Sequence, residues 1–76
     1  MNEHPELLLR LGEAIRQVRE QQRLSVAELA ARSGIAARLI SKVEAGRLDP
    51  TYDVLIALAD GLRVRLSALA SRVDHG

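Results

Sequence analysis

Arg38, Ser41 and Lys42 place three polar side chains within two turns of one predicted helix, next to the small residue Ala37. These four residues share one face, because side chains three or four positions apart on a helix lie one above the other. The apolar residues that can anchor the opposite face are Ile35, Ile40 and Val43. A helix anchored in this way presents its polar face to a partner, and its N-terminal half has the character of a helix that enters the major groove of DNA.

Catalytic chemistry is not indicated by the same residues. Ser41 and Glu44 share a helical face, but no histidine accompanies them. The chain has no cysteine, and its two histidines, His4 and His75, lie near opposite ends. No paired carboxylates, nucleophile with a base, or glycine-rich phosphate loop can be assembled from the sequence. We therefore expect a protein that is not an enzyme, with no metal site and no cofactor.

Two short helices joined by a tight turn must position the polar face. Ser25 and Glu28 have the spacing of a capping box, which predicts that a helix begins at Ser25. This helix ends near Gly34, which suits the left-handed position after a helix. A further helix spans about residues 36–45. Two short helices around a glycine-containing turn form a helix-turn-helix, which we place at about residues 25–46.

Three more helices are predicted around this unit from apolar residues at helical spacing. They run from about Pro5 to Gln22, from Thr51 to about Gly61, and from about Leu66 to Arg72. Their inward residues are Leu8, Leu11, Ile15 and Val18, then Leu55, Leu58, Ala59 and Leu62, and last Leu66 and Leu69. The sequence thus predicts an all-α, compact five-helix bundle. We expect a single domain over residues 1–76, with a core at about 6–72 and short flexible tails.

The net charge of +1 is unevenly distributed. Residues 23–47 contain five basic and two acidic residues, whereas the segments on either side each carry one more acid than base. A concentration of positive charge favours a polyanionic partner, although a solvated helical face would look the same. No apolar run approaches the ~20 residues of a membrane span, and the N-terminus lacks the basic region of a signal peptide. We expect a cytoplasmic protein with no membrane partner.

The segment from about Leu11 to Leu69 resembles the phage-repressor and Cro type of helix-turn-helix, often called the Xre family. The matching residues are Leu24-Ser25, Glu28-Leu29-Ala30, Ser33-Gly34-Ile35, Ile40 to Gly46, Pro50, Leu55, Leu58-Ala59, Leu62, Val64, Leu66 and Leu69. The resemblance implies a lambda-repressor-like fold and a transcriptional regulator that binds double-stranded DNA in a sequence-specific manner. The third helix would then lie in the major groove.

The resemblance also implies roles for individual residues. Ala37, Arg38 and Lys42 correspond to base-facing positions, and Ser41 to a position that reaches a base or a phosphate. Arginine can bind guanine through its two major-groove acceptors, a contact worth roughly 1–3 kcal/mol of discrimination. A solvated surface side chain is the alternative for Arg38 and Lys42.

Other residues correspond to contacts with the DNA backbone or to structural contacts. The phosphate-contact positions are the amides near Ser25 and Val26, then Arg47, with Arg32 and Arg16 as weaker ones. For Arg47 the alternative is a role in capping the loop. Glu44 corresponds to a structural residue that pairs with an arginine of the first helix, here Arg19.

Two positions depart from the family pattern. Val26 stands where the family often has glutamine, so its side chain cannot hydrogen-bond to DNA. Ala36 stands where the third helix usually has a serine or threonine cap, and loss of such a cap costs ~0.5–2 kcal/mol. Both departures make the contact surface poorer in polar groups.

The apolar content exceeds what the inward faces accommodate, and the surplus residues are Leu7, Leu9, Ile56, Val64 and Val73. Exposed apolar patches tend to mark interfaces. We place a homodimer contact on the last two helices, at Ile56, Val64, Leu66 and Leu69, while completion of one small core remains the alternative. A homodimer would read a pseudo-palindromic operator. The competing functional hypothesis is an antitoxin-like or coactivator-like module that uses the same fold to bind a protein partner.

Overall fold

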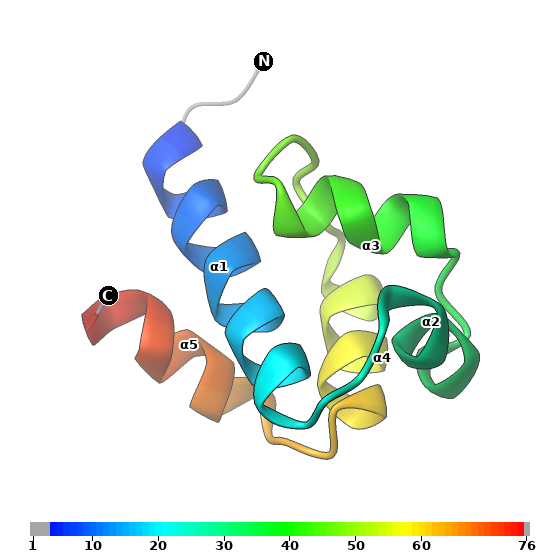
Figure 1. Ribbon diagram of the computed structural model, residues 1–76. Coiled ribbons are helices and arrows are strands. Elements are labelled where there is room, and N and C mark those ends of the chain that lie inside the picture. Colours follow the sequence, from blue (N-terminus) through cyan, green and yellow to red (C-terminus); the bar gives the residue numbers. More distant parts are fainter. Residues whose placement is uncertain (1–3, 76) are drawn as a thin grey trace.

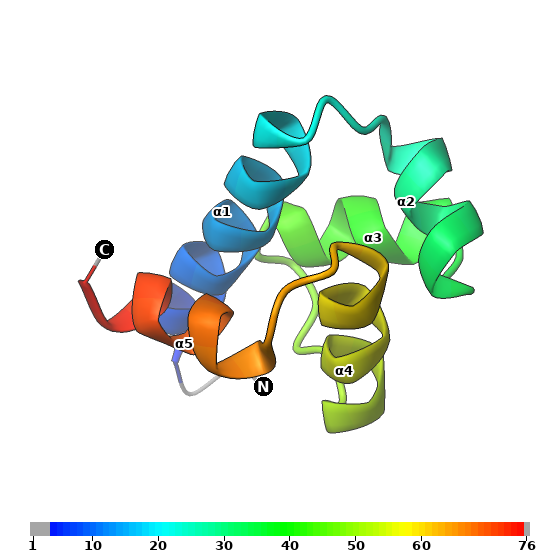
Figure 2. The same cartoon turned by 90° about the horizontal axis from the view of Figure 1, so that it is seen from below.

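The computed structural model describes residues 4–75, with side chains placed as far as Asp74. Five helices make up this part of the chain: α1 (Pro5–Gln21), α2 (Val26–Ser33), α3 (Ala37–Glu44), α4 (Tyr52–Gly61) and α5 (Leu66–His75). Both α3 and α5 pack on α1, while α2 packs on α3 and α4 (Figure 1). From below, α1 and α5 lie on one side, α2 and α4 on the other, and α3 crosses between them (Figure 2). The all-α five-helix fold is confirmed.

The helix ends follow the local signals with two differences. Thr51 caps α4 by accepting a hydrogen bond from the Val54 N–H at 3.3 Å. The third helix is one residue shorter at each end than expected, with Ala36 at its N-cap and no side-chain cap bond. The last helix extends to His75 rather than ending at Arg72, and Val73 is buried instead of surplus. The side chain of His75, on which the expectation about a metal site depends, lies outside the described residues.

The core takes side chains from all five helices. The large residues that are fully buried are Ile15, Leu29, Ile40, Val43, Leu58, Leu62 and Leu69. Burying one such side chain stabilises the fold by about 1.5–3 kcal/mol. Since α2 and α3 have only eight residues each, they would not be stable alone, and this packing holds them in place. Leu69 faces inward as predicted, but at 1% exposure it is not available to a dimer surface.

The backbones of α1 and α3 approach each other closely at Gly12, which is buried. A β-carbon placed on Gly12 would lie 2.5 Å from the Glu44 carbonyl oxygen and would also meet the carbonyl oxygen of Val43. Both obstacles are backbone atoms at the end of α3, and they cannot move without moving the helix. The glycine therefore sets the distance between α1 and the helix that carries the polar face.

We expect Gly12→Ala to lower the free energy of unfolding by about 1–3 kcal/mol, because the methyl group overpacks a backbone contact. Helix propensity alone predicts the opposite, a gain of about 1 kcal/mol. Gly61→Ala is the matched control, since a β-carbon there first meets the Ser33 and Leu29 side chains, at 3.0 and 3.1 Å. Denaturant unfolding of both variants measures the difference. A Gly12→Ala protein as stable as the wild type would contradict the close approach.

Candidate nucleic-acid interface

The third helix divides cleanly into two faces. Ala37, Arg38, Ser41 and Lys42 are all exposed. Ile40 and Val43, on the opposite face, are 0% and 1% exposed. Ile35, just before the helix, packs against the core as a partly buried residue. The structure thus brings the four predicted base-contact residues together on one surface of α3 and leaves their side chains accessible.

The turn between α2 and α3 fixes the angle at which this surface is presented. Gly34 has φ +76°, a left-handed conformation that residues with a β-carbon rarely adopt. Its N–H donates to the Ala30 carbonyl at 2.9 Å, which closes the end of α2. The Ile35 N–H then donates to the Ser33 hydroxyl at 3.2 Å. These bonds close the turn between the two helices, and the left-handed conformation predicted for Gly34 is confirmed.

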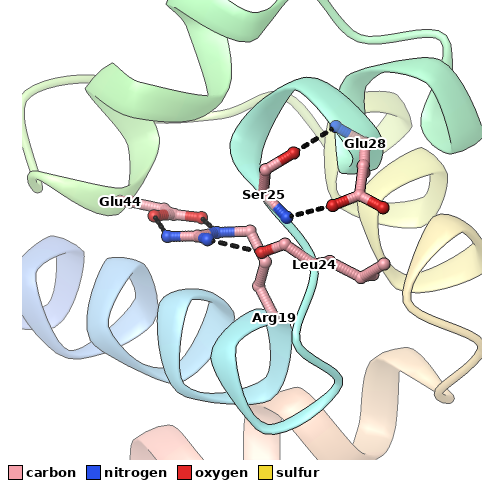
Figure 3. Close-up of polar contacts among 5 residues, drawn as sticks. All are labelled: Arg19, Leu24, Ser25, Glu28 and Glu44. Carbon is pink, nitrogen blue, oxygen red and sulfur yellow. Dashed lines mark hydrogen bonds and ion pairs between the residues drawn. The ribbon is translucent and has the colours of Figure 1, made fainter.

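The N-terminus of α2 carries the predicted capping box (Figure 3). The Glu28 N–H donates to the Ser25 hydroxyl at 3.0 Å, and the Ser25 N–H donates to the Glu28 carboxylate at 2.9 Å. Hydrogen bonds from Ser25, mainly from its backbone N–H, hold the pKa of Glu28 below its usual range. The box leaves the N–H groups of Val26 and Ala27 without intrahelical acceptors. These two N–H groups therefore need an acceptor from outside the helix, while the Val26 side chain packs against the core.

One guanidinium joins three parts of the molecule (Figure 3). Arg19 Nε and Nη2 donate to the two carboxylate oxygens of Glu44 at 2.8 and 2.9 Å. Arg19 Nη1 donates to the Leu24 carbonyl at 2.7 Å. The side chains of Arg19 and Glu44 are only 12% and 7% exposed, and the bond to Glu44, opposed by burial, raises the pKa of Arg19. The pairing of Arg19 with Glu44 that the resemblance implies is present, with its geometry bidentate.

The arginines that are predicted to contact phosphate differ in exposure and in whether a carboxylate already pairs with them. Arg32 and Arg47 are exposed, and Arg47 follows directly after the turn that ends α3. The Arg47 backbone N–H closes this turn by donating to the Lys42 carbonyl at 2.9 Å. Arg16, in contrast, forms an ion pair with Glu13 at 2.5 Å, with both side chains 47% exposed. A neighbouring carboxylate therefore offsets part of its charge.

The predicted dimer residues lie at different depths. Ile56 is 44% exposed on α4, whereas Val64 and Leu66 are half-buried against the core. With Leu69 buried, three of the four residues keep accessible surface. Tyr52, at 68% exposure, lies one turn before Ile56 and was not predicted. Because residues four positions apart on a helix lie on the same face, the spacing from Ile56 would have placed Tyr52 on the same exposed surface.

Two polar contacts in this region were also missed. The Leu24 carbonyl is part of the Arg19 network, and Gln22 Nε2 donates to the Leu62 carbonyl at 2.6 Å. The second bond joins residues 40 positions apart in the chain. No local pattern predicts such a contact, because a glutamine after one helix and a leucine after another are both ordinary at these positions.

We expect Arg19→Ala and Glu44→Ala each to lower the free energy of unfolding by about 3 kcal/mol, because each leaves a largely buried charge without its partner. The double variant Arg19→Met with Glu44→Leu should recover much of this loss, since it removes both charges. Denaturant unfolding of the single and double variants forms a mutant cycle. Single losses below about 0.5 kcal/mol would show that the pair is no stronger than an exposed one.

Known proteins share this arrangement of helices. Residues 15–69 match the model of the helix-turn-helix family, a range that contains α2, the turn and α3 entirely. The chain is 41% identical over 61 residues to the uncharacterized HTH-type transcriptional regulator Rv0474 of Mycobacterium tuberculosis. That match covers 80% of this chain and 44% of the relative, so the chain spans less than half the length of the curated protein. No helix among residues 4–75 is long and apolar enough to cross a membrane.

Solved structures agree with this assignment. The fold is similar to the restriction-modification controller protein C.AhdI from Aeromonas hydrophila, with a TM-score of 0.80 and 27% identity over 82% of this chain and 94% of that one. It is also similar to the clp gene regulator ClgR from C. glutamicum, with a TM-score of 0.85 and 23% identity over 91% of this chain and 90% of that one. The chain therefore belongs to the helix-turn-helix family of the Xre and lambda-repressor type, and it has the DNA-binding fold of HTH-type transcriptional regulators.

Proposed function

We propose that this protein is a sequence-specific transcriptional regulator that acts in the cytoplasm, without catalysis, as a homodimer on a pseudo-palindromic operator. The observation that carries the proposal is the division of α3 into a buried face and an exposed face with Arg38, Ser41 and Lys42. In each protomer α3 lies in the major groove, and the two copies meet half-sites about 34 Å apart, one helical turn of DNA. The likeness to a restriction-modification controller protein supports a regulatory role.

Base readout in this proposal depends on few side chains. Arg38 binds guanine through N7 and O6, since its planar fork matches these two acceptors. Lys42, one turn further along, binds a second guanine or a phosphate. Ser41 can donate to either, and Ala37 offers its methyl group to a thymine methyl. Arg38 therefore carries most of the discrimination.

Backbone contacts position the helix in the groove. The free N–H groups of Val26 and Ala27 bind a phosphate at the positive end of α2, and the Ser25 hydroxyl lies beside them. Arg47 binds a phosphate on the other side of α3, and Arg32 adds charge at the end of α2. Arg16 contributes less, because Glu13 already pairs with it. Such contacts orient the protein without reading sequence.

We expect Arg38→Ala to relax the preference at one position of each half-site, with a loss of roughly 1–3 kcal/mol against the selected base. Lys42→Ala should weaken binding to all sequences alike and lower the salt slope of binding by about 1 per protomer if Lys42 holds a phosphate. In vitro selection of DNA from a random pool, followed by salt-dependent titration of the selected duplex, measures both effects.

Arg10→Ala is the control for this experiment, because Arg10 is an exposed arginine in the N-terminal half of α1, outside the proposed contacts. It should leave the selected sequence unchanged. Failure of the wild-type protein to enrich any sequence would count against the regulator proposal. An unchanged selection by Arg38→Ala would remove Arg38 from base readout.

The dimer contact is proposed from the apolar surface at α1, α4 and α5. A groove of 320 Å³ lies between these helices, and the residues that line it include Leu7, Leu11, Leu55, Leu66, Ala70 and Val73. Leu7 keeps 49% of its surface exposed, and Ile56, which follows the groove residue Leu55 in the chain, keeps 44%. One module of this size covers only about 600–1,000 Å² on DNA. A second copy seated here would cover the apolar surface and double the contact with the operator.

We expect Ile56→Glu and Ala70→Glu each to shift the protein from dimer to monomer, because a carboxylate would be buried without a partner. Both side chains are exposed in the single chain, so the fold itself should survive. Ala31→Glu, on the exposed part of α2, is the matched control. Analytical ultracentrifugation over a range of concentrations measures the oligomeric state. A monomeric wild-type protein at tens of micromolar would contradict the dimer.

A further inference from the structure

A hollow of 530 Å³ lies on the surface of α1, with Glu44 and Ala45 at the end of α3 and Arg72 of α5 as its other walls. In Figure 1, α5 lies on one side of α1 and the end of α3 lies on the other. The volume is within the range of pockets that hold small molecules, about 300–1,000 Å³. The exposed residues of α3 proposed to contact bases do not line it. The hollow is therefore a surface separate from the base-contact face.

The two acids in the walls of the hollow are both paired with arginines. Glu13 forms an ion pair with Arg16, another wall residue, at 2.5 Å. Glu44 accepts hydrogen bonds from Arg19 through both of its carboxylate oxygens, at 2.8 and 2.9 Å. The negative charges of these walls are therefore already offset within the protein.

Two further arginines line the hollow without a carboxylate partner. Arg10 and Arg72 are exposed, and neither is in an ion pair among the side chains placed between residues 4 and 74. Arg72 Nη2 donates to Gln21 Oε1 at 3.1 Å, so a neutral group orients this guanidinium. Glu6, one turn before Arg10, is not part of the hollow. The walls therefore carry two positive charges, one on α1 and one on α5, that none of their acids offsets.

Apolar side chains make up another part of the wall. They belong to Leu9, Ala14 and Ala45. Leu9 lies against Gly46, where an added β-carbon would be 2.6 Å from Leu9 Cδ2, so this side chain is held beside the end of α3. The small side chains of Ala14 and Ala45 leave space that a larger residue would fill. The hollow thus combines two unpaired guanidinium groups with an apolar surface.

We propose that this hollow binds a small dicarboxylate, with one carboxylate on Arg10 and the other on Arg72. The planar guanidinium matches a carboxylate through two parallel N–H···O bonds. The apolar part of the wall covers the short carbon chain that joins the two acidic groups. The ligand contacts α1, α3 and α5 together, and because it binds only the folded chain it stabilises the fold. The proposed site does not require DNA binding.

The test uses succinate, glutarate and adipate, a series of dicarboxylates of increasing chain length, with acetate at the same ionic strength as the control ligand. Isothermal titration calorimetry and thermal unfolding are measured at about pH 7.5, where every carboxylate of the probes is ionised. We expect one chain length to bind best and to raise the unfolding temperature most, because it matches the separation of the two guanidinium groups. Acetate should produce neither effect, since it cannot bridge them.

Variants of the walls locate the binding. Arg10→Gln and Arg72→Gln should each weaken the best dicarboxylate about tenfold, the lower end of the effect of a hydrogen bond to a charged group. Arg65→Gln, which removes an exposed arginine outside the hollow, is the matched control and should bind with the wild-type affinity. Ala45→Leu keeps the charge and fills the hollow from an exposed position, so it should also weaken binding while the fold survives.

Three results would overturn the proposal. If no dicarboxylate binds more tightly than acetate, the two arginines are an ordinary solvated surface. A loss of affinity in Arg65→Gln equal to that in Arg10→Gln would reduce the effect to net charge. Unchanged affinity in Arg10→Gln and Ala45→Leu would place the ligand elsewhere on the protein. DNA selection by the wild type is measured without dicarboxylate, so the regulator proposal stands or fails separately.

Discussion

The Arg19 guanidinium is the contact on which the geometry of this protein depends. It binds both oxygens of Glu44 at the end of α3 and the Leu24 carbonyl in the turn that leads to α2. These two helices have eight residues each and cannot hold their own orientation. One side chain of α1 therefore fixes both the entry to α2 and the end of α3. The close approach at Gly12 fixes the distance between α1 and α3 at backbone level.

Because α3 is fixed in this way, some of its residues anchor it to the fold and the others remain exposed. Ile40 and Val43 are buried, and with Glu44 they tie α3 to the fold. The side chains of Arg38, Ser41 and Lys42 are exposed and do not pack in the core. The polar groups that remain for recognition are few, since position 26 is valine and position 36 is alanine. In the proposed function, affinity would then come from backbone contacts and from a second copy rather than from more base contacts.

Outside α3, the helix ends are where the polar groups and the left-handed residues of the fold are found. The capping box at Ser25 satisfies one amide of α2 and leaves two without an intrahelical acceptor. Gly34 and Gly46 let the chain turn sharply around α3, while Arg23 and Arg63 make equivalent turns with charged side chains. The two pairs of left-handed turns therefore share a backbone conformation and differ in the charge of the residue that adopts it.

Local sequence was sufficient to predict the five helices, the Ser25–Glu28 cap, the left-handed Gly34 and the exposed face of α3. Each of these depends on residues within four positions of one another, where spacing decides the contact. The Arg19–Glu44 pair, 25 residues apart, was expected only from the family resemblance. The end of α5 at His75, the burial of Val73, and the Gln22–Leu62 bond follow from how the helices pack. Only the tertiary structure could decide these features, because they depend on atoms that the chain brings together from distant positions.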